Sequence, residues 1–512
     1  MAKRATAYEL MLSPRNADVP AYGWLYGALR AEILEGRLRP GARLEATREL
    51  AARYGLARGT IVNAFELLKS EGYLEGSAGS GTFVSKVLPE ELLEVRQKAS
   101  ARVAESFRPR RRISEYGKRV RLFSGYEMRP SRAFRSNLPA LELFPTALWA
   151  QIAARRWRGA SANLLRGCDA LGYRSLRDAV ADYLGASRGV KCSGEQIAIV
   201  SGVQEALDIV ARIFLNPGDR VCMENPGYTG AAYAFRAVGA RIRAVPVDEE
   251  GIELGSGNLR GARLIYVTPG HQFPLGITMS LGRRLALLAA ARKIGALIFE
   301  DDYDSEFRYS GRPVPALQGL DEHGVVLFAG SFSKVLFPSL RVGYLVIPRD
   351  LLGYFEAVKS VTSRHAPPAE QAILCDFIVE GHFGRHLRRM REVYAEKLSV
   401  LLGSARERLG GLLEISGIEA GLQTVGWLRG GLGEERVAAA AAKRDVEVTP
   451  VNRYSLGKPV PDGLQIGFAA VDAKEIRRGV EELAIAIEGE REKSMHSLRR
   501  GQRTIATGGE RV

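Results

Sequence analysis

The sequence lacks any long hydrophobic run. Its best candidate, residues 285–299, is interrupted by Arg292 and Lys293, so no segment reaches the roughly 20 apolar residues that a membrane-spanning helix needs. The charged residues near the start of the chain are followed by no apolar segment, so we expect no secretory signal. We therefore expect no association with a membrane.

Cysteine is scarce and scattered. The four cysteines stand at Cys168, Cys192, Cys222 and Cys375, and no pair has the spacing of a metal site or a redox motif. This pattern excludes a small, disulfide-stapled secreted domain, and we predict no metal site. A reduced, cytoplasmic protein is the simplest interpretation.

Acidic residues are outnumbered by basic ones. The 58 Asp and Glu against 73 Lys and Arg leave a net charge of +15, and a basic surface favours a polyanionic partner. Residues 86–120 hold 10 basic against 5 acidic side chains, and residues 491–512 hold 6 against 2. Two interpretations stay open for these segments: solvated polypeptide and non-specific contact with DNA phosphates.

Residues 20–85 show the order of a winged helix-turn-helix. Apolar residues recur at helical spacing over residues 24–35, which predicts a first helix. Thr47 is the expected N-cap of a second helix, and Arg58 or Gly59 begins a third. Two strand-like pieces follow, at residues 73–75 and 82–85, joined by a glycine-rich tip. Three helices and a hairpin predict a DNA-binding module.

The third helix of such a module can lie in the major groove of double-stranded DNA. It carries Arg58, Thr60 and Asn63 near its start. Arginine reaches guanine or phosphate, threonine reaches phosphate or a thymine methyl, and asparagine reaches adenine. Arg48 is well placed for a phosphate or a base edge, and the glycine-rich tip can approach the DNA backbone. The predicted DNA-binding residues are Arg48, Arg58, Thr60, Asn63, Gly79, Ser80 and Gly81.

Five short motifs occur in order over this region. They are GRLRPGARL at 36–44, TRELA at 47–51, RGTIV at 58–62, EGYL at 71–74 and GSGTFV at 79–84. Together they resemble the winged helix of the GntR family of regulators, which implies an operator in double-stranded DNA as the partner. One departure is Ala57, where the family usually has a hydroxyl residue, so we expect the loss of a phosphate contact or of a helix cap.

Residues 131–488 alternate apolar strand-like runs with helical stretches, which predicts an α/β domain with a parallel sheet. Five of the runs end in polar or glycine-rich loops. These runs are residues 197–200, 221–223, 264–267, 297–299 and 325–328. Ligands of open α/β sheets bind at the carboxyl ends of the strands, so we expect the five loops to form one pocket.

The residues of these loops suit an aldehyde cofactor with a phosphate group. Lys334 can form a Schiff base, and burial would lower the pKa of its amine and favour the nucleophilic form. A carboxylate at a strand end can keep a pyridinium nitrogen protonated, and Tyr303 can hydrogen-bond a phenolic oxygen. The expected phosphate donors are the helix start at Ser201, Gly202 and Val203 and the side chains of Ser331, Ser333 and Arg341.

Four motifs in these loops carry a second resemblance. They are NPGY at 225–228, VTPGHQFP at 267–274, EDDYDSEFRY at 300–309 and SFSK at 331–334. They resemble fold-type I aminotransferases and, more narrowly, the MocR/GabR-type subfamily of GntR regulators. The resemblance implies a mostly parallel sheet with helices on both faces, a small C-terminal α+β subdomain and pyridoxal 5'-phosphate as the cofactor.

The same resemblance implies roles for individual residues. Lys334 is the catalytic lysine, joined to the cofactor as an internal Schiff base, and Arg341 serves its phosphate. Asp301 pairs with the ring nitrogen, with Asp302 as the alternative because the two acids are adjacent. Tyr228 is the aromatic residue of the pocket. His271 or Gln272 takes the place of the usual asparagine near the ring oxygen.

One position departs from the aminotransferase pattern. Aminotransferases generally keep an arginine that grips the substrate carboxylate just before a motif like residues 466–469, and here that position is Gln465. Arg453 or Arg364 could substitute. Without the bidentate guanidinium, recognition of an α-amino acid is weakened, which favours a regulator that senses the cofactor itself or an amine.

Three functions are therefore weighed. The first is a DNA-binding transcription regulator whose aminotransferase-like domain binds pyridoxal phosphate and senses it or an amino compound, with at most residual enzyme activity. The second is an active aminotransferase with an accessory DNA-binding module. The third is a regulator whose large domain has lost the cofactor. The resemblance implies a head-to-tail homodimer, and paired half-sites on DNA also favour a dimer.

The predicted organisation has five parts. They are an N-terminal segment at 1–19, the winged helix at 20–85, a basic linker at 86–130, the aminotransferase-like domain at 131–488 and a disordered tail at 489–512.

Overall fold

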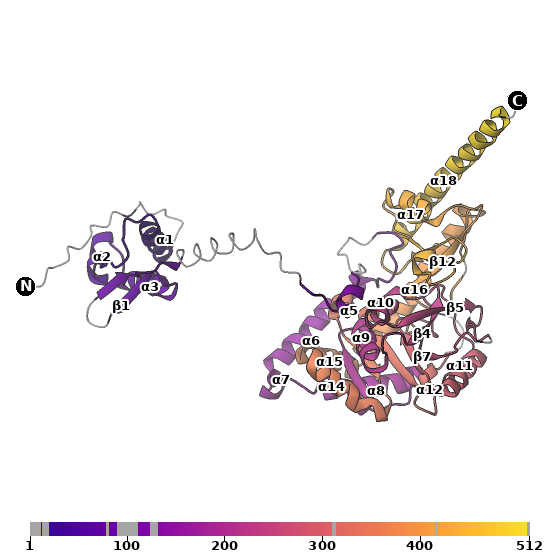
Figure 1. Ribbon diagram of the computed structural model, residues 1–512, viewed down its shortest axis with the longest axis horizontal. Helices are drawn as coiled ribbons and strands as arrows, with labels where there is room; N and C mark the ends of the chain where they lie inside the picture. The colour runs from indigo at the N-terminus through magenta and orange to yellow at the C-terminus, as the bar shows by residue number, and fades with distance from the viewer. Residues whose placement is uncertain are drawn as a thin grey trace, which may run out of the picture. The chain divides into compact units, whose positions relative to one another are not determined.

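The computed structural model describes residue 12 and residues 20–77, 81–89, 111–122, 132–255, 257–309, 314–415 and 417–508. The chain forms two compact units, Met1–Arg112 and Ile113–Val512, and the division falls inside the predicted linker (Figure 1). The predicted N-terminal segment at 1–19, apart from Leu12, lies outside the described residues, as do Gly79 and Ser80. Among the described helices, none is long and apolar enough to cross a membrane.

The first unit contains three helices and a hairpin, as predicted. Its elements are α1 (Ala21–Leu34), α2 (Thr47–Tyr54), α3 (Arg58–Ser70), β1 (Leu74–Ser77) and β2 (Gly81–Val84). The two strands pair antiparallel, with Leu74 opposite Val84. The backbone of residues 41–44 runs beside β2, since Gly41 N donates to Val84 O and Leu44 N donates to Thr82 O, both at 2.9 Å.

The helices of this unit form because their apolar residues recur every three or four positions. Leu25, Leu29 and Ile33 line one face of α1 and are buried. The buried face of α3 consists of Ile61, Ala64, Phe65 and Leu68, and these side chains share one core with Leu50 of α2. The polar side chains of α3 are thereby left on its outer surface.

The helix starts differ in detail from the prediction. The N-cap of α2 is Ala46, so Thr47 is already the first helical residue and the predicted cap is wrong by one position. The carboxylate of Glu49 accepts a hydrogen bond from Ala46 N at 3.3 Å, which is one half of a capping box, and the other half is missing because Ala46 has no side-chain hydroxyl. Ala57 is the N-cap of α3 and makes no side-chain cap, which agrees with the expected loss.

The second unit is built on an eight-stranded sheet in the order β3-β10-β9-β8-β7-β4-β5-β6. The strands are β3 (Ile197–Val200), β4 (Arg220–Asn225), β5 (Arg241–Asp248), β6 (Gly251–Ile252), β7 (Ala262–Val267), β8 (Leu297–Asp302), β9 (Val326–Ser331) and β10 (Gly343–Val346). Only β10 and β6 run against their neighbours, so the described sheet is mostly parallel. All five predicted strands are confirmed.

Helices cover both faces of this sheet, as the family resemblance implied. Alternate residues of β7 show this arrangement. Leu264 and Tyr266 pack in one core with α9 (Val203–Phe214) and α10 (Thr229–Ala237), whereas Ile265 and Val267 pack on the other side with α11 (Leu281–Ile294). The longer helices of the unit are α6 (Thr146–Arg158), α8 (Arg174–Arg188), α9 (Val203–Phe214), α10 (Thr229–Ala237), α11 (Leu281–Ile294), α14 (Leu352–Thr362), α15 (Pro368–Val379), α16 (His382–Arg408), α17 (Glu434–Ala442) and α18 (Ala473–Gly508). Shorter ones are α5 (Glu115–Arg119), α7 (Ala162–Arg166), α12 (Leu317–Leu320) and α13 (Phe332–Val335).

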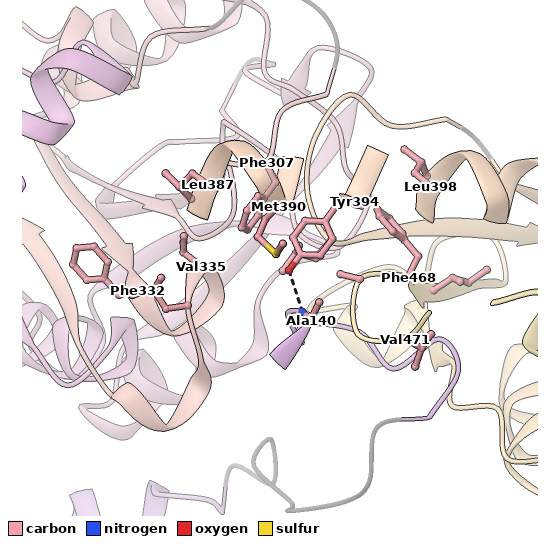
Figure 2. Close-up of a cluster of buried hydrophobic side chains, with 14 of the residues drawn as sticks. Ala140, Phe307, Phe332, Val335, Leu387, Met390, Tyr394, Leu398, Phe468 and Val471 are labelled. Carbon is pink, nitrogen blue, oxygen red and sulfur yellow. Dashed lines mark hydrogen bonds between the residues drawn. The ribbon is translucent and has the colours of Figure 1, made fainter. Parts of the chain in front are cut away.

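A small C-terminal subdomain contains a second, antiparallel sheet in the order β11-β12-β14-β13. Its strands are β11 (Leu413–Ile415), β12 (Gln423–Leu428), β13 (Thr449–Pro450) and β14 (Gly463–Gly467). The long helix α16 joins this subdomain to the large sheet. Figure 2 shows its side chains Leu387, Met390 and Tyr394 in the core, where the Tyr394 hydroxyl accepts a hydrogen bond from Ala140 N at 3.0 Å.

Two predicted segments differ from the structure. Within the predicted linker, α5 packs on the large unit: the hydroxyl of Tyr116 accepts from Arg212 of α9 at 3.1 Å, and the guanidinium also lies over the ring. The predicted disordered tail is wrong from residue 489 to 508, because α18 continues to Gly508. The sequence of this helix contains no proline, and a Lys493–Glu490 ion pair one turn apart supports the helix.

Candidate functional site

The strand ends and loops of the large sheet surround a cavity of about 460 Å³. Its walls come from α9, β8, the loop after β7, the β9–α13 junction and the C-terminal sheet. The lining residues include Arg135, Ser136, Asn137, Gly202, Val203, Gln204, Tyr228, Tyr266, Thr268, Phe273, Asp301, Tyr303, Ser331, Ser333, Lys334, Arg341, Glu447, Thr449, Arg453 and Tyr454. The predicted cofactor-binding residues are all among them except Ser201 and His271.

Lys334 lies at the centre of the predicted site. It belongs to the single-turn helix α13, whose start is capped by the Ser331 hydroxyl accepting from Ser333 N at 3.2 Å. The Lys334 amine donates to Asn137 O at 2.9 Å. Burial lowers the pKa of this amine to about 8, although the nearby Asp304 and Asp301 act in the opposite direction. About a tenth of the amine is therefore uncharged and nucleophilic at pH 7, far more than for a lysine with its ordinary pKa.

Asp301 and Asp302, adjacent at the end of β8, lie in different surroundings. Asp301 lines the cavity, and its Oδ2 accepts from the Tyr266 hydroxyl at 2.7 Å, whereas its Oδ1 is buried without a partner among the described residues. Burial raises the pKa of Asp301 to about 7. Asp302 lies outside the cavity lining and forms a buried ion pair with Arg188 at 2.8 Å. Asp301 is thus the carboxyl group available to a ligand.

The start of α9 forms a polar cradle with the β9–α13 junction. Gly202, the N-cap of α9, has φ 116°, and a Cβ there would lie 3.0 Å from Nη2 of Arg341. The Ser333 hydroxyl is buried, and no group of the described chain hydrogen-bonds to it. Backbone N–H groups at a helix start, a hydroxyl and a guanidinium together suit an anion.

The backbone N–H of Ser201 does not belong to this cradle, which corrects the prediction. It donates to Oε2 of Glu205, one turn into the same helix. The other oxygen of that carboxylate accepts from Lys359 at 3.1 Å and from the Ser363 hydroxyl at 2.7 Å. The sequence spacing alone did not show this hydrogen bond between Ser201 and Glu205 at the helix start.

The aromatic wall of the cavity is built around Phe273, which sequence reasoning missed. The Phe273 ring meets Tyr228, Tyr303 and Tyr454 edge to face, with centroids 5.8, 5.9 and 4.9 Å apart. Tyr266, which lies in a predicted strand, and Thr268, which directly follows that strand, were also missed. Alternation along β7 would have pointed to Tyr266, but nothing in the sequence marks Phe273 as a lining residue.

His271 and Gln272 do not line the cavity, and their predicted role beside the ring oxygen stays a prediction. His271 is buried behind Tyr303: its Nδ1 lies 2.9 Å from Asp304 Oδ1 and 3.0 Å from the Tyr303 hydroxyl. The amide of Gln272 donates to backbone carbonyls, including Pro226 O at 2.9 Å. Phe273, two residues further along the loop than His271, lines the cavity.

Gln465 is buried on β14, next to the outer part of the cavity. Its Oε1 accepts from the hydroxyls of Ser136 and Tyr454, both at 2.9 Å and both lining the cavity. Arg453 also lines the cavity, but its guanidinium makes two hydrogen bonds to Glu435, at 2.8 and 2.6 Å. Arg364 lies outside the lining.

The predicted DNA-binding side chains lie outside the core of the first unit. Arg58 and Asn63 are exposed on α3, and Thr60 is partly exposed, away from the buried face of that helix. Arg48 is exposed on α2, and Gly81 begins β2. These positions are compatible with a helix that presents polar side chains to a groove.

Comparison with known proteins agrees with the two units. Residues 21–84 match the family of bacterial regulatory proteins named gntR, and residues 134–483 match aminotransferase class I and II. The chain is 40% identical over 478 residues to the "Probable rhizopine catabolism regulatory protein MocR" of Rhizobium meliloti, over 93% of this chain and 96% of that protein. It is 29% identical over 466 residues to the pyridoxine biosynthesis regulator PdxR of Corynebacterium glutamicum, over 90% of this chain and 94% of that one.

Among solved structures, the second unit is similar to LysN, an α-aminoadipate aminotransferase of Thermus thermophilus complexed with N-(5'-phosphopyridoxyl)-L-leucine. The TM-score is 0.68 at 30% identity, over 76% of this chain and 98% of LysN. Fold and site together define a winged helix-turn-helix module fused to a class I/II aminotransferase domain. The chain belongs to the MocR-type transcription regulators of the GntR family, whose helix-turn-helix module binds DNA.

Proposed function

We propose that this regulator binds pyridoxal 5'-phosphate through Lys334 and changes its DNA binding when the cofactor or an amino compound occupies the cavity. The observation that carries the proposal is one juxtaposition. A lysine amine whose pKa is lowered to about 8 shares a cavity with Asp301, a buried carboxyl group with one unused oxygen among the described residues. The protein acts in the cytoplasm, on operator DNA.

The residues present fit this cofactor at three points. Lys334 supplies the amine for the aldehyde. The unused Oδ1 of Asp301 suits a pyridinium N–H, and the cradle of Gly202, Ser333 and Arg341 suits a phosphate. When bound, the cofactor would act as an electron sink for an amino compound.

The chain's own residues hold the ligand and its protons. Tyr266 donates to Asp301 Oδ2, which keeps the other oxygen directed to a ligand. Nδ1 of His271 lies within hydrogen-bond distance of both the Tyr303 hydroxyl and the Asp304 carboxylate, so these three groups hold one another at the wall. Because these supporting residues are buried, the positions of the side chains lining the cavity are fixed before a ligand enters.

DNA recognition is proposed for the exposed polar face of the first unit. Asn63 and Arg58 would read base edges, while Arg48 would contact a phosphate. The family resemblance supports a head-to-tail homodimer, in which two such modules would occupy paired half-sites.

An active aminotransferase is the second candidate, and the intact lysine site favours it. The chain is also 32% identical over 364 residues to the 2-aminoadipate transaminase of Thermus thermophilus. Against it stands Gln465, which offers no guanidinium to a substrate carboxylate. Multiple-turnover transfer of an amino group to a keto acid would support the enzyme and contradict a pure regulator.

The proposal is tested by gel shift on the chain's own upstream region, with and without pyridoxal phosphate, for wild type and Lys334→Ala. Lys191→Ala, at an exposed lysine, is the matched control. We expect the cofactor to change affinity or footprint in wild type and control but not in Lys334→Ala. Specific binding with no response to the cofactor would contradict cofactor sensing and direct the search to amino compounds. An absence of specific DNA binding at moderate salt would favour the active aminotransferase over the regulator.

A further inference from the structure

The first turn of α9 carries a negative charge directly beside the cradle proposed for a phosphate. Glu205 is the third residue of this helix, and Gly202 of the cradle is the N-cap. Oε2 of Glu205 accepts a hydrogen bond from the backbone N–H of Ser201, the residue that directly precedes Gly202. The carboxylate is therefore held next to the helix start, where its charge opposes the binding of an anion.

A buried lysine offsets this charge. Lys359 of α14 has only 1% of its side chain exposed, and its Nζ donates to Oε1 of Glu205 at 3.1 Å. The Ser363 hydroxyl donates to the same oxygen at 2.7 Å. Burial acts to raise the pKa of Glu205, but the Lys359 ammonium and the hydrogen bonds outweigh it, so this pKa lies below its ordinary value. Glu205 is therefore a carboxylate at neutral pH, and Lys359 is its counter-charge.

Anchoring the backbone at Ser201 does not by itself require a charge. A glutamine at position 205 would offer the same kind of acceptor oxygen to the Ser201 N–H, and it would need no buried lysine. Apolar side chains of similar volume often stabilise a fold as well as a buried ion pair does. The two opposite charges therefore have a consequence apart from holding α9 and α14 together.

That consequence is electrostatic, because neither side chain lines the cavity. Coulomb interactions between buried groups are screened much less than interactions in water, so charges one helix turn from the cradle act on a ligand there. A lone carboxylate of Glu205 would repel a phosphate. With Lys359 beside it, the backbone N–H groups of the helix start and the guanidinium of Arg341 retain their attraction for the anion.

We propose that the Glu205–Lys359 pair sets how strongly the cradle prefers a ligand with a phosphate group over the same ligand without one. Lys359 raises this preference by cancelling the charge of Glu205, and Glu205 lowers it. Lys359 is a positioning residue, since it acts through Glu205, and neither side chain is catalytic. The inference rests on the proposed function and assigns two specificity-determining residues to the same site.

The test compares pyridoxal 5'-phosphate with pyridoxal, which lacks the phosphate. Both Kd values are measured by spectroscopic titration of the cofactor-free full-length protein, and their ratio gives the phosphate preference. Lys359→Met keeps the length of the side chain but removes its charge, so the preference should fall about tenfold. Glu205→Gln keeps an acceptor for the Ser201 N–H and leaves the Lys359 charge uncancelled, so the preference should rise about threefold.

The opposite signs separate charge from structure. If the pair only held the two helices together, loss of either partner would loosen the helix start, and the phosphate preference would fall in both variants. That result overturns the proposal. The double variant Glu205→Gln/Lys359→Met carries no charge at these two positions, so its preference should lie within about threefold of wild type.

A second buried lysine provides the matched control. Lys397 is buried in the same unit, donates to Ala469 O at 2.7 Å and does not line the cavity. Lys397→Met should leave the phosphate preference unchanged, and a fall equal to that in Lys359→Met contradicts the proposal. If Lys359→Met does not fold, Glu205→Gln and the double variant still decide, because they differ only at Lys359. Glu205→Gln should then show about tenfold more preference, and equal values overturn the proposal.

The failure of this proposal and the failure of the proposed function are distinguishable. Binding of pyridoxal phosphate with the same preference in wild type and in all variants overturns only the role of the Glu205–Lys359 pair. If wild type binds neither pyridoxal phosphate nor pyridoxal, cofactor binding itself is wrong, and the proposal falls with it.

Discussion

Nε of Arg188 lies 2.8 Å from Oδ2 of Asp302, and both side chains are buried. The preceding residue, Asp301, instead directs its carboxyl group into the cavity. Adjacent acids on one strand thus serve different purposes, because successive side chains of a strand point to opposite faces.

The two acids should respond differently to substitution. Asp302→Asn leaves the Arg188 guanidinium buried beside a neutral amide, so we expect it to lower the free energy of unfolding by about 3–5 kcal/mol. Asp301→Asn keeps an acceptor for Tyr266, so it should change stability little while weakening pyridoxal phosphate binding by about tenfold or more. Urea unfolding of the cofactor-free protein and a spectroscopic titration measure the two effects. Equal stability losses would contradict this division.

A glycine pair tests the cradle at α9. Gly202 and Gly218 both have positive φ, 116° and 94°, so alanine strains either backbone by about 1–2 kcal/mol. Only at Gly202 would the new Cβ approach Arg341, at 3.0 Å, whereas nothing lies within 4 Å at Gly218. We expect Gly202→Ala to reduce pyridoxal phosphate affinity about tenfold and Gly218→Ala to leave it unchanged. Equal pyridoxal phosphate affinities of the two variants would contradict a role of the cradle in binding the cofactor.

The pKa of Lys334 should set the pH dependence of cofactor attachment. Burial lowers this pKa from its ordinary value to about 8, so the uncharged amine is gained as pH rises through 8. The rate at which pyridoxal phosphate attaches to the cofactor-free protein should rise to a plateau with a midpoint near pH 8. Stopped-flow absorbance measures this rate. A rate that is still climbing above pH 10 would contradict the buried amine.

Buried carboxyl groups should make the cofactor-free protein less stable as pH rises. Burial raises the pKa of Glu224, Glu300 and Asp301 to about 7, above the ordinary values near 4. The folded state therefore binds more protons between about pH 4.5 and 7, and each group lowers the free energy of unfolding by at most about 1.4 kcal/mol per pH unit in that window. Glu224→Gln should remove the contribution of one carboxyl group from the slope of unfolding free energy against pH. Glu249→Gln, at an exposed site, should leave that slope unchanged.

Substitutions on the first unit should separate base contacts from phosphate contacts. Asn63→Ala should weaken operator binding by about 1–3 kcal/mol and relax the base preference at one position. Arg48→Ala should weaken binding to all sequences and reduce the salt slope by about 1. Arg37→Ala is the control, because Glu32 already holds that guanidinium at 2.7 Å. Gel shifts at several salt concentrations measure the operator affinity of all three variants. An unchanged operator affinity in Asn63→Ala would contradict the proposed binding of α3 in the major groove.

Local signals in the sequence were sufficient for the elements and for much of the cavity. The spacing of Leu25, Leu29 and Ile33 predicted α1, and apolar runs followed by polar loops predicted β8, which holds Asp301, and β9, which directly precedes the turn of helix with Lys334. Such patterns are readable because a helix or a strand repeats its buried face at a fixed period. The loop after β7 is not periodic, which is why nothing in the sequence marked Phe273 as a residue of the cavity wall.

The sequence by itself determined the two-unit organisation, the order of the elements and the residue types that gather at the strand ends. Only the tertiary structure decided which of two adjacent acids faces the cavity, that Glu205 takes the Ser201 N–H, and that Gln465 binds two hydroxyls of the cavity lining. The reason is physical: periodicity and propensity act over a few residues, whereas a hydrogen bond between Ser136 and Gln465 joins positions that only the folded chain brings together.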